Sequence, residues 1–142
     1  MEIRKLTTDD YEHLADLWTK AGLPFKPRGR DSKKAIAAQM AANPQFFLGA
    51  FEDDRLVGSA IVSSDIRKGW INRLAVDPES RRKGIARRLI AESEKVLRKQ
   101  GIRIFCALID DDNVSSKSLF GTCGYREHRD IVYFSKHRTD DI

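Results

Sequence analysis

The sequence predicts an α/β fold of the α+β kind, with a mixed, mostly antiparallel central sheet of six to seven strands and helices on both faces. Two observations support this prediction. Residues 46–76 read as three consecutive strands joined by tight turns, which favours antiparallel neighbours. Residues 70–109 read as a strand, a long helix and a second apolar strand, a unit whose two strands run parallel. At 142 residues the chain is expected to be one domain, spanning 1–142.

The first part of the chain reads as a short strand followed by two helices. Residues 3–6 form the strand, and the apolar residues of 7–21 recur at helical spacing and are expected to face the core. The loop 22–30 holds two prolines, two glycines and three basic residues, and it is either a connector or one wall of a substrate cleft. The Asp-Ser pair at 31–32 is expected to cap a second helix, which ends before Pro44.

A β-hairpin follows these helices. Its strands are residues 46–52 and 55–64, joined by an Asp-Asp turn. Gly58 in the second strand marks either a bulge or a close packing contact. A further turn leads to the strand 70–76, which completes the run of three antiparallel strands.

The last third of the chain is predicted to return to the sheet. Residues 103–109 are almost continuously apolar, which predicts a strand buried on both faces and parallel to the strand 70–76. A short helix is expected over 115–122, capped by Asn113 or Ser115. Final strands are expected at Tyr125 and over residues 131–135.

The turn between the strand 70–76 and the long helix is the candidate binding site. A helix N-terminus offers unpaired backbone N–H groups and the positive end of the helix dipole, and Gly84 lets an anion approach the backbone. These features predict a cradle for phosphate or diphosphate, although the single glycine excludes a P-loop or a dinucleotide fingerprint. The competing interpretation is an ordinary turn with a solvated charged surface. The basic residues around the turn are Arg81, Arg82, Lys83 and Arg87.

Composition restricts the possible ligands and locations. The net charge of +5 favours an anionic partner, either a cofactor or a nucleic acid. Two cysteines are too few for a disulfide framework, and three widely spaced histidines do not predict a zinc site. The three aspartates 110–112 lack the spacing of a calcium loop, so we expect no metal. With no signal peptide and no membrane-length apolar run, we expect a cytoplasmic protein without a membrane partner.

Two motifs and the element order resemble the GNAT superfamily of acetyl-CoA-dependent N-acetyltransferases. The first motif is a Leu-x-Val-x-Pro strand end at 74–78, followed by Arg-x-x-Gly-x-Ala at 81–86. The second is Asn-x-x-Ser-x-x-Leu-Phe-x-x-x-Gly-Tyr at 113–125. Each motif is weak alone, but together they are specific at this spacing, and the resemblance covers nearly the whole chain.

The resemblance implies acetyl-CoA as the co-substrate. It implies that the backbone amides of residues 82–87 hold the diphosphate, and that the two central parallel strands splay apart around the pantetheine arm. The Leu74 amide would then polarise the thioester carbonyl. The residues implied to bind the cofactor are Leu74, Ala75, Val76, Arg81, Arg82, Lys83, Gly84, Ile85, Ala86, Arg87, Asn113, Ser116 and Phe120.

The residues that would act as acid and base stay unassigned. Phe120 stands where the family often places a tyrosine that protonates the departing thiolate, and phenylalanine cannot do this. Water, Cys123 or Tyr125 could substitute for it. Some relatives use a glutamate on the central strand as the base, where this chain has Asn72 and Arg73. The nearest acids, all expected at the surface, are Asp65, Glu79 and Asp110.

The resemblance therefore predicts an N-acetyltransferase, in which a primary amine of a small molecule, protein or peptide attacks acetyl-CoA directly in a ternary complex. One alternative is a CoA-binding regulatory module with little or no catalysis. A less favoured alternative is a nucleic-acid-binding protein that uses the basic residues 81–88. The basic loop 22–30 favours an acceptor amine that carries a carboxylate or phosphate, and a protein N-terminus is equally allowed. The C-terminal strands could form a homodimer.

Overall fold

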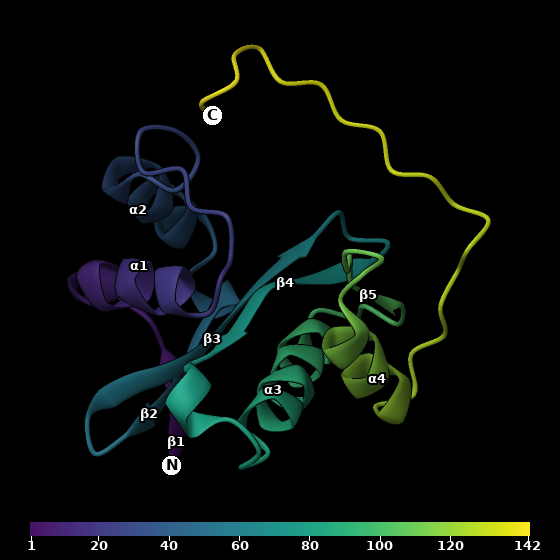
Figure 1. Ribbon diagram of the computed structural model, residues 1–142, viewed down its shortest axis with the longest axis horizontal. Helices are drawn as coiled ribbons and strands as arrows, with labels where there is room; N and C mark the ends of the chain where they lie inside the picture. Colours follow the sequence, from purple (N-terminus) through teal and green to yellow (C-terminus); the bar gives the residue numbers. More distant parts are fainter.

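The computed structural model describes all 142 residues and contains one five-stranded sheet with four α-helices (Figure 1). The strands lie in sequence order across the sheet, and only the pair β4–β5 is parallel. Short 3-10 turns precede α1, β2 and α3. The elements are β1 (Glu2–Lys5), α1 (Tyr11–Lys20), α2 (Lys33–Ala42), β2 (Phe47–Glu52), β3 (Arg55–Ser64), β4 (Gly69–Val76), α3 (Ile85–Lys99), β5 (Phe105–Cys106) and α4 (Val114–Thr122).

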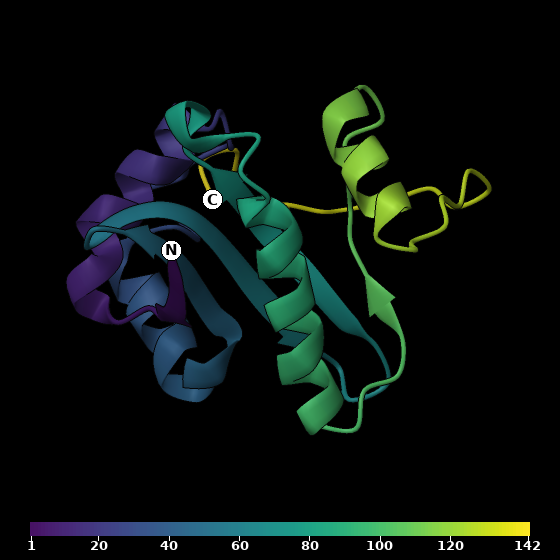
Figure 2. The same ribbon diagram turned by 90° about the horizontal axis from the view of Figure 1, so that it is seen from below.

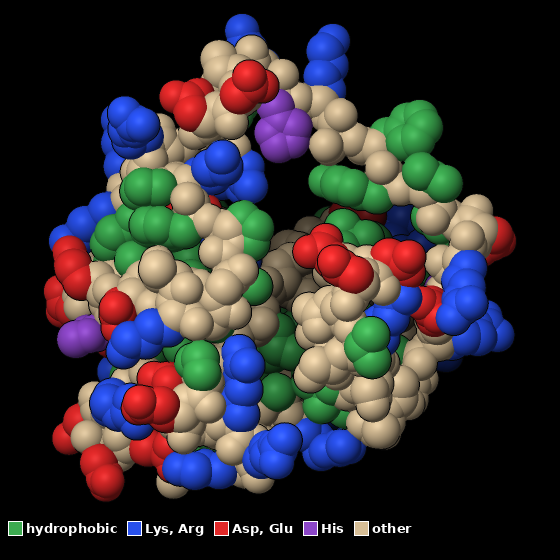
Figure 3. All heavy atoms as spheres, in the orientation of Figure 1, with side chains coloured by type: hydrophobic (Ala, Val, Ile, Leu, Met, Phe, Trp, Pro, Cys, Tyr) green, Lys and Arg blue, Asp and Glu red, His purple; other side chains and the backbone are tan.

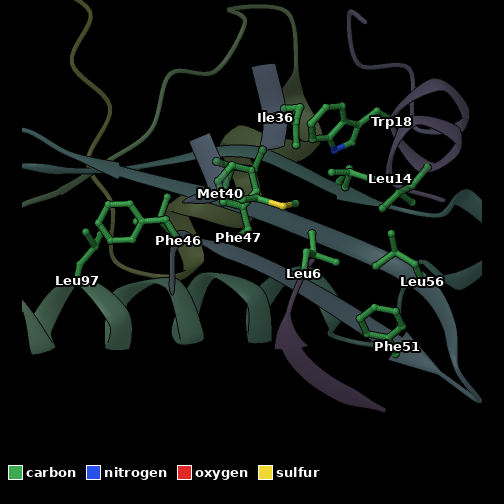
Figure 4. Close-up of a cluster of buried hydrophobic side chains, with 14 of the residues drawn as sticks. Leu6, Leu14, Trp18, Ile36, Met40, Phe46, Phe47, Phe51, Leu56 and Leu97 are labelled. Carbon is green, nitrogen blue, oxygen red and sulfur yellow. The ribbon is translucent and has the colours of Figure 1, made fainter. Parts of the chain in front are cut away.

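Helices cover both faces of the sheet, which confirms the predicted layers (Figures 1 and 2). On one face, Trp18 of α1 and Met40 of α2 pack over Phe47 of β2 (Figure 4). On the other face, Leu89 of α3 and Phe120 of α4 belong to a second buried cluster. The sheet is thus the middle layer of three, and the helices α1 and α3 are amphipathic, with one apolar face turned to the sheet.

The β2–β3 hairpin is confirmed, and Gly58 fulfils both of its predicted roles. The register shifts beside it, because Ala50 pairs with Gly58 whereas Phe51 pairs with Leu56. A Cβ at Gly58 would also lie only 3.0 Å from the side chain of Leu89. The missing side chain lets α3 approach the sheet closely at this point.

The predicted count of six to seven strands is wrong, because nothing after α4 joins the sheet. Tyr125 lies at the end of the turn after α4 instead of starting a strand, and its amide donates to the Phe120 carbonyl at 3.0 Å. Residues 131–134 are at least 70% exposed and pair with no strand. Their apolar, β-branched and aromatic character suits a strand, but a strand also needs a neighbouring edge, and β5 is only two residues long.

The second parallel strand is shorter and more exposed than predicted. Of the predicted strand 103–109, only Phe105 and Cys106 pair with β4. Ile104 and Leu108 are 51% and 59% exposed, so burial on both faces is wrong. The predicted parallel direction is confirmed.

Candidate functional site

The turn from β4 into α3 is held rigidly at its entry. The carboxylate of Asp77 is almost fully buried, accepts a 2.9 Å hydrogen bond from the Glu79 amide and lies 3.2 Å from the Arg55 guanidinium. After this turn, Arg82 and Gly84 take positive φ angles of 67° and 77°. These two left-handed residues lie directly before the helix, which begins at Ile85 with Gly84 as its N-cap.

The backbone amides of residues 81–87 have no hydrogen-bond partner within the protein. No backbone carbonyl and no side chain accepts from them, and the first amide to bond is that of Arg88, which donates to the Gly84 carbonyl at 3.1 Å. A Cβ at Gly84 would meet no atom within 4 Å, so the space beside this residue is open. This row of free donors at a helix N-terminus has the geometry of an anion site.

The four basic side chains of this region take different roles. Arg81 and Arg82 are exposed and make no ion pair, whereas Lys83 lies 3.4 Å from a Glu52 carboxylate oxygen. Arg87 points toward α4, where it donates a 2.9 Å hydrogen bond to the Thr122 hydroxyl. Arg81 and Arg82 are therefore free to meet an anion, while Arg87 ties α3 to α4.

Beyond its first two residues, β4 has a free edge toward β5. The Gly69 amide donates to the Ile104 carbonyl at 2.9 Å, and the strand pairing ends at Trp70. The chain after β5 then leaves β4 on its way to α4 (Figure 2). Leu74 and Val76 of β4 are only half-buried, and the surface is hollowed between the α1–α2 half and the β5–α4 half (Figure 3). An extended ligand could pair with this free edge as an added strand would.

A bulge interrupts β4 where the sequence predicts the carbonyl-polarising amide. Asn72 pairs with Ile61 and Ala75 pairs with Ser59, which leaves two residues, Arg73 and Leu74, opposite one residue of β3. Arg73 has a φ of 50°. A bulge removes an amide from the ladder and bends the strand, so Leu74 lies where the backbone departs from regular pairing.

The predicted α4 residues lie at opposite ends of that helix. The Asn113 side chain caps the helix by accepting a 3.0 Å hydrogen bond from the Ser116 amide. Phe120 is 5% exposed and packs edge-to-face on Tyr125, with ring centroids 5.0 Å apart. Ile85, at the start of α3, is likewise buried, so only its backbone can face a ligand.

Three of the candidate proton donors and acceptors, Tyr125, Cys123 and Asp65, contact other groups of the protein. The Tyr125 phenol donates a 2.7 Å hydrogen bond to Glu94, and burial together with this bond raises the pKa of Tyr125 well above its usual value. The Cys123 thiol accepts a long contact of 3.9 Å from the Arg87 guanidinium. Asp65 accepts from the Lys68 amide at 2.7 Å within a surface turn, which lowers the pKa of Asp65. The acid and base of a reaction stay unassigned.

Two residues that sequence reasoning did not place in the site meet behind the bulge. Asp31 is 5% exposed and lies 2.9 Å from the Arg73 guanidinium, which stacks over the ring of Trp18 at 4.3 Å. The predicted cap of α2 by the Asp-Ser pair is confirmed, and the capping residue is Ser32, whose hydroxyl accepts from the Ala35 amide, which leaves the Asp31 carboxylate for the ion pair. The available signal was a charged residue in the middle of a strand whose other residues, apart from Asn72, are apolar or glycine.

The structure holds no group of three or more histidine, cysteine or acidic side chains arranged to bind a metal. Asp111, one of the three consecutive aspartates, pairs with Lys117 at 2.6 Å. None of the helices combines the length and apolar character needed to cross a lipid bilayer.

Comparison with known proteins gives consistent results. The family model described as acetyltransferase (GNAT) family matches residues 3–125. An acetyltransferase of Photorhabdus laumondii is 33% identical over 137 residues, which is 96% of this chain and 94% of that protein. The crystal structure of the PaiA N-acetyltransferase of Thermoplasma acidophilum in complex with coenzyme A has a TM-score of 0.75 and 29% identity, covering 88% of this chain and 89% of that one. The ribosomal-protein-S18-alanine N-acetyltransferase of Escherichia coli shares the fold, with a TM-score of 0.73 and 20% identity over 89% of this chain and 78% of that one.

Proposed function

Since this chain belongs to the acetyltransferase (GNAT) family, we propose that it transfers an acetyl group from acetyl-CoA to a primary amine of a small molecule, protein or peptide. The observation that carries the proposal is the row of partnerless amides at residues 81–87, beside the free edge of β4. The coenzyme A bound by the PaiA relative supports the same cofactor here.

The residues present fit acetyl-CoA. The amides of residues 82–87 would hold its diphosphate, with Arg81 adding positive charge, and the β4 edge at Leu74 and Val76 would pair with its pantetheine arm. The bound molecule would supply an activated thioester. The residues that would line it from α4 are Asn113, Ser116 and Phe120.

The proposed reaction is direct attack in a ternary complex. The neutral amine nitrogen bonds to the acetyl carbonyl carbon, and the carbon–sulfur bond breaks. The proton that the nitrogen loses passes to the sulfur, directly or through water, so that CoA leaves as the thiol. The Leu74 amide, in the bulge, would polarise the carbonyl oxygen. A lysine-like amine is deprotonated in only about one molecule in 2,500 at pH 7, so an amine of lower pKa or a water relay would ease the attack.

The charge of the loop between α1 and α2 indicates the chemical class of the acceptor amine. Lys26 is half-buried and Arg28 is exposed in this loop, and neither forms an ion pair. Their charge favours an amine that also carries a carboxylate or phosphate, and it disfavours a polycation. A protein N-terminus is equally allowed as the acceptor.

Thermal unfolding in the presence of acetyl-CoA tests the proposal, followed by a thiol-release screen over amino acids, small amines, polyamines and peptides. We expect stabilisation of about 2.7 kcal/mol at a hundredfold excess over Kd, and thiol release with at least one amine. Stabilisation without turnover over the whole panel would favour the CoA-binding module. Absence of stabilisation at millimolar acetyl-CoA, with salt-sensitive binding to a nucleic acid, would favour the nucleic-acid-binding alternative.

We also propose that the chain forms a homodimer. The side chains of Ile131, Val132, Tyr133 and Phe134 are exposed, and a second copy could cover them. Sedimentation equilibrium of the wild type and of Val132→Glu tests this. We expect a dimer for the wild type and a shift toward monomer for the variant, and a wild-type monomer at high concentration would contradict the proposal.

A further inference from the structure

The bulge in β4 is held from both its backbone and its side chain. The Ser59 hydroxyl, fully buried in β3, donates a 2.9 Å hydrogen bond to the Arg73 carbonyl and accepts one of 3.0 Å from the Trp18 indole. The Arg73 guanidinium stacks over that same indole. Trp18 therefore holds Arg73, whose left-handed backbone forms the bulge, in two ways. It holds the Arg73 carbonyl through Ser59, and it holds the guanidinium by direct stacking.

The Arg73 side chain also reaches the loop between α1 and α2. One of its nitrogens, Nη2, donates to the Asp31 carboxylate at 2.9 Å and to the Pro24 carbonyl. Asp31 accepts in turn from the Lys26 amide at 2.9 Å, and its carbonyl accepts from the Tyr11 phenol. The ion pair thus joins the loop 22–31 to a point in β4 that is 42 residues away.

These contacts leave the Arg73 guanidinium engaged within the protein. Its charge faces the buried Asp31, and its flat face covers Trp18. Left-handed backbone in a residue other than glycine persists only where the surroundings hold it. The neighbours of Arg73 do this through three hydrogen bonds, while the side chain of Leu74, the other bulge residue, packs against the second buried cluster.

We propose that Asp31 and Arg73 form a clamp that fixes the β4 bulge and the loop 22–31 as one unit, which makes Arg73 a positioning residue for the Leu74 amide. This inference rests on the proposed acetyl transfer. The clamp acts on the reaction centre through the backbone, and it does not reach the amides at 81–87 that would hold the cofactor. Losing it should therefore slow the chemical step more than it weakens cofactor binding.

Steady-state kinetics of clamp variants provide the first test. For Arg73→Met we expect kcat to fall about 100-fold, because a displacement of about 1 Å near the reacting atoms can cost that much. The KM for acetyl-CoA should stay within about threefold. Arg73→Lys should lose only about tenfold, since lysine keeps the charge but lacks the flat, forked guanidinium. The double variant Asp31→Asn/Arg73→Met should be no slower than Arg73→Met alone, because both changes break one unit.

Two matched controls separate positioning from general loss of stability. Lys33→Met breaks an exposed ion pair between α1 and α2, with Glu12 at 3.1 Å, and should leave kcat unchanged. Leu6→Ala removes a buried side chain that lies beside Gly49 of β2, and should lower the Tm without changing kcat below the transition. A kcat for folded Arg73→Met within about threefold of wild type would overturn the positioning role.

Amide hydrogen exchange provides a readout that needs no activity. In Arg73→Met, amides 72–75 and 22–31 should exchange about tenfold faster or more, together, while those of α3 keep the wild-type rate. Unchanged exchange in either segment would overturn the clamp. A wild-type protein that neither binds acetyl-CoA nor releases thiol would refute the proposed function alone, because the exchange experiment still tests the clamp.

Discussion

The Tyr125 phenol donates a 2.7 Å hydrogen bond to the Glu94 carboxylate, which ties the segment after α4 to the middle of α3. The ring packs edge-to-face on Phe120, the residue at the position where the family often has a tyrosine. Burial and then the bond to Glu94 raise the pKa of Tyr125 well above its ordinary value. These contacts indicate that the Tyr125 side chain has a structural role and holds the helix α4 in place.

We predict that Tyr125→Phe lowers the free energy of unfolding and leaves the chemistry intact. The variant loses one charge-assisted hydrogen bond, so we expect a cost of about 1–2 kcal/mol, measured by urea unfolding. The kcat for thiol release should stay within about threefold. A tenfold or greater fall in kcat of the folded variant would instead make Tyr125 the proton donor.

Gly84→Ala should weaken CoA binding, and Gly101→Ala should not. The two glycines stand at opposite ends of α3 with φ angles of 77° and 79°, and a Cβ meets no protein atom at either place. Both substitutions should cost about 1 kcal/mol of stability through backbone strain. Only at Gly84 would the methyl group enter the anion cradle, and we expect about tenfold weaker binding by calorimetry. Equal affinities for the two variants would argue against a cofactor at this turn.

Arg82→Gln should reduce both the affinity for CoA and its salt dependence. Arg82 is exposed and unpaired beside the free amides. Its charge would attract the diphosphate across solvent that contains screening ions, so we expect it to contribute about 1 kcal/mol to binding, which is about fivefold in Kd. Lys99→Gln, at the other end of α3, removes the same charge and is the control. Titrations at low and high sodium chloride measure the effect, and identical salt slopes for wild type and Arg82→Gln would contradict it.

Asp10 should stabilise the fold in a pH-dependent way. Burial opposes its charge, but hydrogen bonds from Arg4, at 3.3 Å, and from the Thr7 amide, at 2.8 Å, outweigh burial and lower the pKa of Asp10. A lowered folded-state pKa means that the unfolded chain binds the proton more tightly. The contribution is therefore present above about pH 4 and is lost as the pH falls through the folded-state value.

We predict that Asp10→Asn costs about 1–2 kcal/mol of unfolding free energy at pH 7. The difference from wild type should shrink in acid below about pH 4. Denaturant unfolding from pH 7 to pH 3 measures it. A difference that stays constant over this range would show that the charge of Asp10 is not the source of the stability.

The parts of the fold that the sequence predicts well depend on local physics. The hairpin and α3 follow from short-range periodicity, and the free amides before Arg88 follow from the way any helix begins. The Asp-Ser pair before α2 correctly predicts a capped helix start, with Ser32 as the cap, but this local pattern does not predict the ion pair that Asp31 forms. Only the folded chain brings Asp31 to Arg73, 42 residues away.

The wrong predictions of strands in the last third of the chain also come from reading a local pattern without its surroundings in the fold. The apolar run at 131–134 has the residue types of a strand, yet pairing depends on whether another edge is available in space. The run 103–109 was expected to be covered on both faces, but pairing with β4 stops at Trp70. An apolar segment beside an opening and a buried strand have the same local pattern, so sequence alone does not separate them.

The central claim is that the partnerless amides after β4 bind the cofactor diphosphate. The most direct measurement is an amide-resolved NMR titration of the wild-type protein with coenzyme A. We predict that the largest chemical-shift changes fall on the amides of residues 82–87, with further changes at residues 74–76. Unchanged shifts at residues 82–87 with millimolar coenzyme A present would contradict the account.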